Sequence, residues 1–95
     1  MANVNNIVEK MKALGDPTRL RLLALLQDQE LSVGSLVDIL RMAQSGISRH
    51  LKVLLDSGLV ELRKAGTSSY YRIADEIDED ILNYLTPIWA SDDIF

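Results

Sequence analysis

The chain has 95 residues, of which 47% are hydrophobic and 25% are charged, a balance typical of one soluble globular domain. It contains no cysteine, which excludes disulfides, thiolate metal sites and thiol-based redox sensing. No apolar run approaches the roughly 18 residues that span a membrane, and the N-terminus lacks a basic and then apolar signal pattern. We therefore expect no membrane partner and a cytoplasmic location.

The net charge of −4 is unevenly distributed along the chain. Residues 41–72 carry six basic and two acidic side chains, whereas residues 75–95 carry seven acidic side chains and no basic ones. The local field acts on a phosphate more strongly than the total charge does. The middle of the chain is therefore a candidate nucleic-acid surface, and we expect the acidic end to lie away from it.

Two helices are predicted in the first 27 residues. Residues 3–14 place apolar side chains at helical spacing and end at Gly15. Asp16 and Pro17 then form a helix start, because a carboxylate caps free amides and proline fits the first helical position. The helix that follows, to about residue 27, is apolar nearly all round and should be central.

A short helix, a turn and a longer helix come next. Ser32 can cap a helix over 33–40, and residues 30–31 can form a short strand before it. Residues 41–43 make the turn. The longer helix covers 44–57 and closes at Gly58, which suits a left-handed C-terminal cap.

The helix over 44–57 has two unlike faces when it is projected at 100° per residue. Ile47, Leu51 and Leu54 can anchor it on a core, while the polar side chains share a sector of roughly 140°. Amides, hydroxyls and cations match the hydrogen-bonding base edges in the DNA major groove. We interpret this as a recognition helix, with four base-reading residues: Gln44, Ser45, Ser48 and Arg49.

A β-hairpin is predicted from two alternating runs, 59–64 and 69–74, with turn-forming residues 65–68 between them. Its basic end, residues 63–69, can lie against the DNA backbone or in the minor groove, and we call it the wing. The residues expected to hold phosphates and set the register are Lys52 in the preceding helix and, in the wing, Arg63, Lys64 and Thr67.

The last helix is predicted over 76–90, with an acidic start that suits a helix N-terminus. Pro87 biases Thr86 out of the helical region, so we expect the helix to end or kink near 85–86. The complete order (α-α-α-α-β-β-α) is that of a winged helix-turn-helix, mainly α with a small β-hairpin, in one domain over 1–95.

Four segments resemble the ArsR/SmtB type of winged-helix repressor, in register over about residues 7–74. They are LGDPTRLRLLALL (14–26), ELSVGSL (30–36), QSGISRHLKVLLDSGLV (44–60) and RKAGTSSYYRI (63–73). The most specific part comprises Ser48, His50 and Leu51, followed by Leu55 and then Gly58, Leu59 and Val60.

The resemblance implies a homodimer that binds an inverted repeat in double-stranded DNA and releases it when an inducer binds. It also implies that the first and last helices form the dimer interface. Here those helices carry apolar stripes that lack an obvious partner in a 95-residue monomer, so periodicity indicates the same surface. The residues expected in the interface are Ile7, Met11, Ile81, Leu85 and Trp89.

The chain departs from the metal-sensing members of that family. Ser32 and Gly34 stand at the positions of the sensor cysteines, and the last helix has no histidine, so we expect no metal and no cofactor. Ala43 replaces the usual Ser or Thr ahead of the recognition helix, which predicts a start without a side-chain cap. His50, the only histidine, falls beside the apolar face, and we assign it to packing or a backbone hydrogen bond rather than to a metal.

Two other functions remain open at this point. The acidic end favours a protein-docking winged helix, because fold does not fix function. Related domains also occur fused to methyltransferases, so the chain could be the DNA-binding part of a larger enzyme. It contains no catalytic arrangement of its own. Met11, Tyr84 and Trp89 could line an inducer pocket, although such apolar stripes are far more often packing, and no inducer is indicated.

Overall fold

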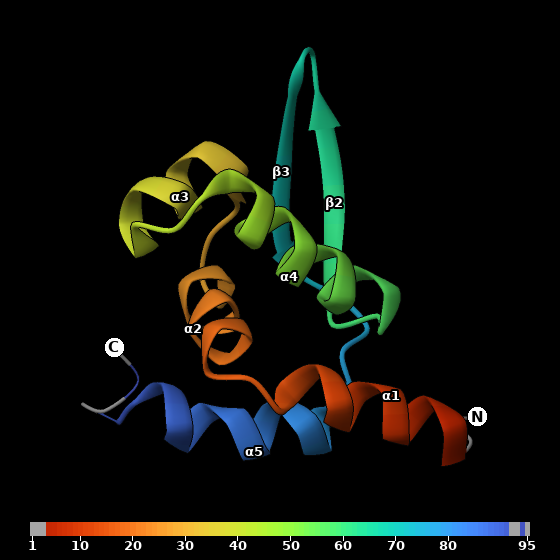
Figure 1. Ribbon diagram of the computed structural model, residues 1–95. Helices are drawn as coiled ribbons and strands as arrows, with labels where there is room; N and C mark the ends of the chain where they lie inside the picture. The colour runs from red at the N-terminus through yellow and green to blue at the C-terminus, as the bar shows by residue number, and fades with distance from the viewer. Residues whose placement is uncertain (1–3, 92–93, 95) are drawn as a thin grey trace.

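The computed structural model describes residues 4–91 and 94, which form five helices and a three-stranded antiparallel sheet. The hairpin of β2 and β3 projects from the helices, and α1 and α5 lie at the end of the molecule away from its tip (Figure 1). This is the predicted winged helix-turn-helix. Its elements are α1 (Val4–Leu14), α2 (Pro17–Leu26), β1 (Leu31–Ser32), α3 (Val33–Leu40), α4 (Gln44–Asp56), β2 (Val60–Ala65), β3 (Ser68–Ile73) and α5 (Glu79–Trp89).

The core is built around α2, as its nearly all-round apolar sequence predicts. Leu22 and Leu23 of α2 have no exposed area. The apolar face of α4 packs into the same cluster, and its three residues also have no exposed area: Ile47, Leu51 and Leu54. Each such side chain contributes roughly 1.5–3 kcal/mol on burial. This anchors α4 on one side and leaves its polar side facing outward.

The sheet has the strand order β1-β3-β2. β2 and β3 pair as far as Ala65 opposite Ser68, so the loop of the hairpin has two residues, Gly66 and Thr67. Gly66 has a φ of 62°, a value that glycine adopts without the cost of a Cβ. β1 lies one residue later than predicted and pairs with β3, with Leu31 opposite Tyr71.

The caps of α3 and α4 follow the sequence prediction. Ser32 Oγ accepts a hydrogen bond from the Ser35 amide at 3.2 Å, while Ala43 gives α4 no side-chain cap. At the other end of α4, Gly58 has a φ of 80°. The Leu59 amide donates to the Leu54 carbonyl at 3.0 Å, which completes a Schellman motif and directs the chain into β2.

The predicted start of α5 is corrected from residue 76 to Glu79. Asp78 caps the helix, because its carboxylate accepts a hydrogen bond from the Asp80 amide at 2.9 Å. The residues before it form a separate turn, in which the Ile77 amide donates to the Ala74 carbonyl at 3.2 Å. The acidic run therefore divides between a turn and the first helical turn.

Of the two outcomes expected near 85–86 within the predicted bounds of 76–90, an end or a kink, the end is wrong. The helix runs through Pro87 to Trp89. Proline removes one helical hydrogen bond, but Leu85 and Trp89 on either side of it are buried, and their packing holds this part of the chain in place. The Thr86 hydroxyl adds a bond of 2.8 Å to the Leu82 carbonyl one turn earlier. Tertiary packing thus overrides the local preference.

Asp16 caps α2 through one carboxylate oxygen, which accepts from the Thr18 amide at 2.8 Å and the Arg19 amide at 3.2 Å. Burial raises the pKa of this carboxyl. The two amide hydrogen bonds, helped by nearby positive charge, lower it by more, so the pKa of Asp16 lies below its ordinary value of 3.8. The carboxylate is therefore stabilised in its charged form in the folded chain.

We predict that Asp16→Ala lowers the free energy of unfolding by about 1 kcal/mol at neutral pH. Because the pKa of Asp16 is depressed on folding, its charge stabilises the fold above the unfolded value of 3.8. That contribution is lost as the pH falls through the folded value. Urea unfolding of both proteins along an acid series measures the difference, which should shrink with acidification. Asp16→Asn, which keeps an acceptor, should cost less, and equal losses for both variants would contradict the cap.

Candidate nucleic-acid interface

The predicted base-reading residues all lie on the outward side of α4, and we call this set the reading face. Gln44, Ser45, Ser48 and Arg49 are each exposed. Within the described residues, the Arg49 guanidinium makes no ion pair or hydrogen bond. The reading face therefore offers amide, hydroxyl and guanidinium groups without internal partners that a ligand would have to displace.

Lys52 extends the reading face by one turn. Its ammonium lies 3.2 Å from an Asp56 carboxylate oxygen, and both side chains are largely exposed. An exposed pair of this kind on a helix is worth only about 0.3–0.5 kcal/mol. A phosphate can therefore take the place of Asp56 at little cost.

The wing has a different charge arrangement from the one that its sequence suggests. Lys64 and Thr67 are exposed near the tip, as predicted. Arg63, however, lies over the Tyr70 ring at 5.2 Å, and its Nε donates to both carboxylate oxygens of Glu30, at 2.8 and 3.1 Å. These hydrogen bonds lower the pKa of Glu30 and raise that of Arg63. Arg63 is thus engaged within the chain before any ligand binds.

Other basic side chains in the middle of the chain divide into paired and unpaired groups. Arg72 Nη2 lies 3.0 Å from Glu61 and 3.1 Å from Asp75, so its charge is neutralised locally. Arg41 is exposed, stands at the turn between α3 and α4 with a φ of 56°, and has no ion-pair partner in the part of the chain that the structure describes. The sequence analysis counted Arg41 among the basic residues but did not name it as a candidate phosphate contact, although it lies in the turn directly before the recognition helix.

His50 has a partner that the sequence did not indicate. Its Nδ1 lies 3.2 Å from Nη1 of Arg19, a side chain 31 residues earlier. The prediction of a packing role holds in that the ring is half-buried against α2, but the hydrogen-bond partner is a side chain and not the backbone. Among the described residues, no group of three or more His, Cys, Asp or Glu side chains is placed to hold a metal.

The apolar stripes predicted on α1 and α5 differ in their exposure to solvent. On α1, Ile7 and Met11 are 47% and 66% exposed, and on α5, Ile81 is half-buried. Leu85 and Trp89 belong to the chain's own core, at 0% and 9% exposure, so their assignment to a surface for a second copy is corrected. Helical spacing marks an apolar face but does not say which partner covers it.

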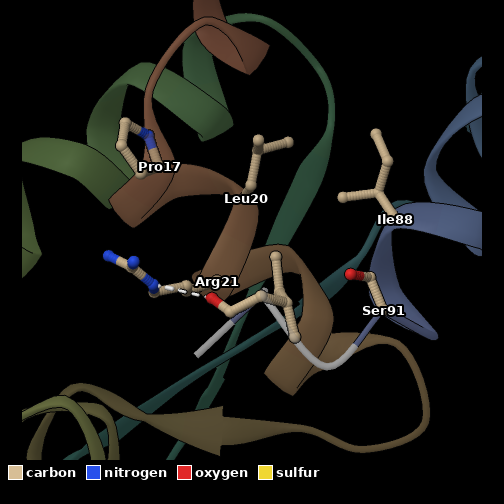
Figure 2. Close-up of a pocket in the computed structure, with 6 residues that line it drawn as sticks. Pro17, Leu20, Arg21, Ile88 and Ser91 are labelled. Atoms are coloured by element: carbon tan, nitrogen blue, oxygen red, sulfur yellow. Dashed lines mark hydrogen bonds between the residues drawn. The ribbon is translucent and has the colours of Figure 1, made fainter.

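A hollow of about 190 Å³ lies between α2 and α5 (Figure 2). The Arg21 Nε donates to the Ile94 carbonyl at 2.7 Å across it. Met11, Tyr84 and Trp89, the residues considered for a pocket from the sequence, do not line it. The residues that line it are Pro17, Leu20, Arg21, Ile88, Ser91 and Ile94.

No helix in the described part of the chain is long and apolar enough to cross a membrane.

Comparison with known sequences finds bacterial and archaeal transcriptional regulators. The family model "Bacterial regulatory protein, arsR family" matches residues 16–61. An uncharacterized HTH-type transcriptional regulator of Methanocaldococcus jannaschii is 39% identical over 83 residues, covering 86% of this chain and 93% of the relative. The arsenical resistance operon repressor of Staphylococcus aureus is 36% identical over 81 residues, covering 85% of this chain and 78% of the relative.

Solved structures agree with the fold. HlyU from Vibrio cholerae superposes with a TM-score of 0.79 at 32% identity, covering 92% of this chain and 95% of that chain. A homodimeric winged helix-turn-helix DNA-binding domain from Mycobacterium bovis gives 0.77 at 33% identity, covering 90% and 76%. HlyU is named a transcriptional activator and the S. aureus protein a repressor, so the relatives regulate in both directions.

Proposed function

Because the chain belongs to the ArsR family of winged helix-turn-helix transcriptional regulators, we propose that it is a dimeric repressor of an inverted-repeat operator. The observation that carries this proposal is the reading face of α4, whose polar side chains are open while the opposite side of the helix is fully buried. In this arrangement α4 enters the major groove and the wing lies against the backbone or in the minor groove. The relatives are transcriptional regulators and not enzymes.

The proposed contacts fall into two classes. Base edges are read by the reading face, that is, by Gln44, Ser45, Ser48 and Arg49. Phosphates are held by Lys52, Lys64, Thr67 and Arg63, with Arg41 added from its exposure and lack of a partner. Arg63 would have to exchange the Glu30 carboxylate for a phosphate. Sensing of a metal through cysteine has no place in the proposal, because the chain contains none.

The proposed dimer uses the outer side of α1. Ile7 and Met11 are exposed there, and Val4 joins them at 75% exposure. The M. bovis domain that shares this fold is a homodimer. Since an inverted repeat has two-fold symmetry, a symmetric dimer presents one α4 to each half-site.

The direct test is selection of bound duplexes from a random pool, followed by affinity measurement across a salt series. An enriched inverted repeat, with binding that falls steeply as salt rises, is the expected result. Weak binding to all duplexes, with no enriched sequence, would contradict the proposal and favour a protein-docking role. Transcription from a promoter that overlaps the selected repeat then distinguishes repression from activation.

We predict that Arg49→Ala reduces discrimination against mutated half-sites by roughly 1–3 kcal/mol, because one base contact is lost. Arg49→Lys is the matched control for charge. It keeps the cation but loses the planar fork, so it should lose most of the discrimination and keep the salt dependence. Fluorescence anisotropy on specific and mutated duplexes measures both. Unchanged discrimination in both variants would contradict the contact between Arg49 and a base.

Lys64→Ala should weaken binding to all duplexes about equally and reduce the salt slope by about 0.9, the value for one phosphate contact. Lys10→Ala removes the same charge from α1, at the far end of the molecule from the wing, and should leave the slope unchanged (Figure 1). A similar change in both variants would show that total charge, and not a wing contact, sets the salt dependence.

Glu30→Gln should raise DNA affinity and steepen the salt slope by up to about 0.9, because Arg63 no longer has to leave a carboxylate. Glu9→Gln makes the same charge change on α1, where Glu9 lies 3.8 Å from Lys12, and should have no such effect. A loss of affinity in Glu30→Gln would instead mean that the ion pair orders the wing for binding.

A further inference from the structure

The guanidinium of Arg19 joins three helices, and all three of its nitrogens are engaged. From the first turn of α2, Nε donates to the Ala13 carbonyl at 2.6 Å and Nη2 donates to the Lys12 carbonyl at 3.1 Å, both at the end of α1. Nη1 lies 3.2 Å from Nδ1 of His50 on α4. A single planar group thus connects the end of the exposed helix α1 with the middle of the recognition helix.

The bond to His50 has a defined direction. Arginine has only donors, so the histidine Nδ1 must be the acceptor. The interaction therefore depends on an acceptor at the Nδ1 position and not on a second charge, which makes it possible to replace it by an isosteric side chain.

The two bonds to α1 reach carbonyls at the C-terminal end of the helix. The Lys12 and Ala13 carbonyls are among the last four of α1, which lack partners in the regular helical ladder. The Lys12 carbonyl also accepts from the Gly15 amide at 3.2 Å, so Arg19 is a second donor there, while its Nε bond at 2.6 Å serves the Ala13 carbonyl. A positive group at a helix C-terminus is also favoured by the helix dipole. Arg19 thereby fixes the direction in which α1 leaves the core.

The base of the Arg19 side chain is fixed as well. Its amide donates to the Asp16 carboxylate at 3.2 Å, within the cap of α2. Because both the backbone and the guanidinium are held, Arg19 has little freedom to follow a shift of α4. His50 lies between Arg49 of the reading face and Leu51, which has no exposed area.

In a dimer, the contact that Arg19 makes between α1 and α4 would affect the distance between the two copies of α4. The two copies of α4 must enter successive major grooves, about 34 Å apart along the duplex. If α1 belongs to the dimer interface, the angle between α1 and α4 in each protomer determines that separation. We propose that Arg19, through His50, is a positioning residue that sets the spacing between half-sites accepted by the dimer, an inference that rests on the proposed function.

The test uses two substitutions of His50 that leave Arg19 free to cap α1. His50→Asn places an amide oxygen close to the position of Nδ1, whereas His50→Leu has similar bulk and no acceptor. Affinities are measured by anisotropy for the selected operator and for versions whose half-sites are moved apart or together by one and two base pairs. A single half-site duplex and the monomer–dimer equilibrium are measured in parallel.

We expect wild type and His50→Asn to prefer one spacing, while His50→Leu loses at least about threefold of that preference, since coupling between residues in contact commonly exceeds this value. Affinity for the single half-site and dimerisation should change less than twofold. A merely structural role would lower these quantities and leave the spacing preference intact. An unchanged preference in His50→Leu, or equal losses in both variants, overturns the proposal.

A measurement without DNA separates this proposal from the proposed function. The chain has no cysteine, so Asp56→Cys, at the exposed end of α4, gives one spin label per protomer. Pulsed electron resonance should show one narrow distance in this protein and a broader or shifted distribution after His50→Leu is added. An unchanged distribution overturns the positioning role. A changed one, in a protein that binds no duplex, supports it while rejecting DNA binding.

Arg19→Lys completes a double-mutant cycle. A single ammonium cannot reproduce the planar fork that reaches α1 and α4 together. If the fork acts through His50, adding His50→Leu to Arg19→Lys should widen the distance distribution no further. Additive broadening would mean that the two residues position α4 independently, which contradicts the proposal.

Discussion

The burial of one side of α4 determines what its other side can do. Ile47, Leu51 and Leu54 have no exposed area, so the helix is held against α2 in one rotational setting. At 3.6 residues per turn, that setting directs Ser48 and Arg49 to solvent. The same helix ends in the Schellman motif at Gly58, which directs the chain into β2. The reading face and the wing are therefore oriented by one packed surface.

The reading face and the wing carry fewer unpaired positive charges than the number of basic residues in the sequence suggests. Arg72 is neutralised by Glu61 and Asp75, and Arg63 by Glu30. The acidic start of α5 lies on the side away from the wing tip (Figure 1). Since non-specific affinity for DNA comes from phosphate contacts, a surface with few free cations binds random duplexes weakly. In the proposed complex, base contacts would then supply a larger share of the affinity, which favours discrimination over tight binding.

Features that depend on neighbours in sequence could be predicted, whereas those that depend on packing could not. The bounds of α3, its Ser32 cap and the two-faced α4 follow from spacing and capping rules. Whether α5 ends, kinks or continues at Pro87, and whether Leu85 lies in the chain's own core, could not be decided from the sequence, because both depend on contacts with the core. The engagement of Arg63 by Glu30 joins residues 33 positions apart, and no local pattern marks it.

Arg19 shows how local and distant constraints meet in one residue. The cap formed by Asp16 could be predicted from its neighbour Pro17, but the partners of the Arg19 guanidinium are 6, 7 and 31 residues away. A ligand or a second protomer that shifts the end of α1 must either break these bonds or move α4 with it. In the proposed dimer, a change at the α1 surface would reach the reading face through these hydrogen bonds, without unfolding any element. Whether such a change reaches α4 would therefore depend on the hydrogen bonds of the Arg19 guanidinium.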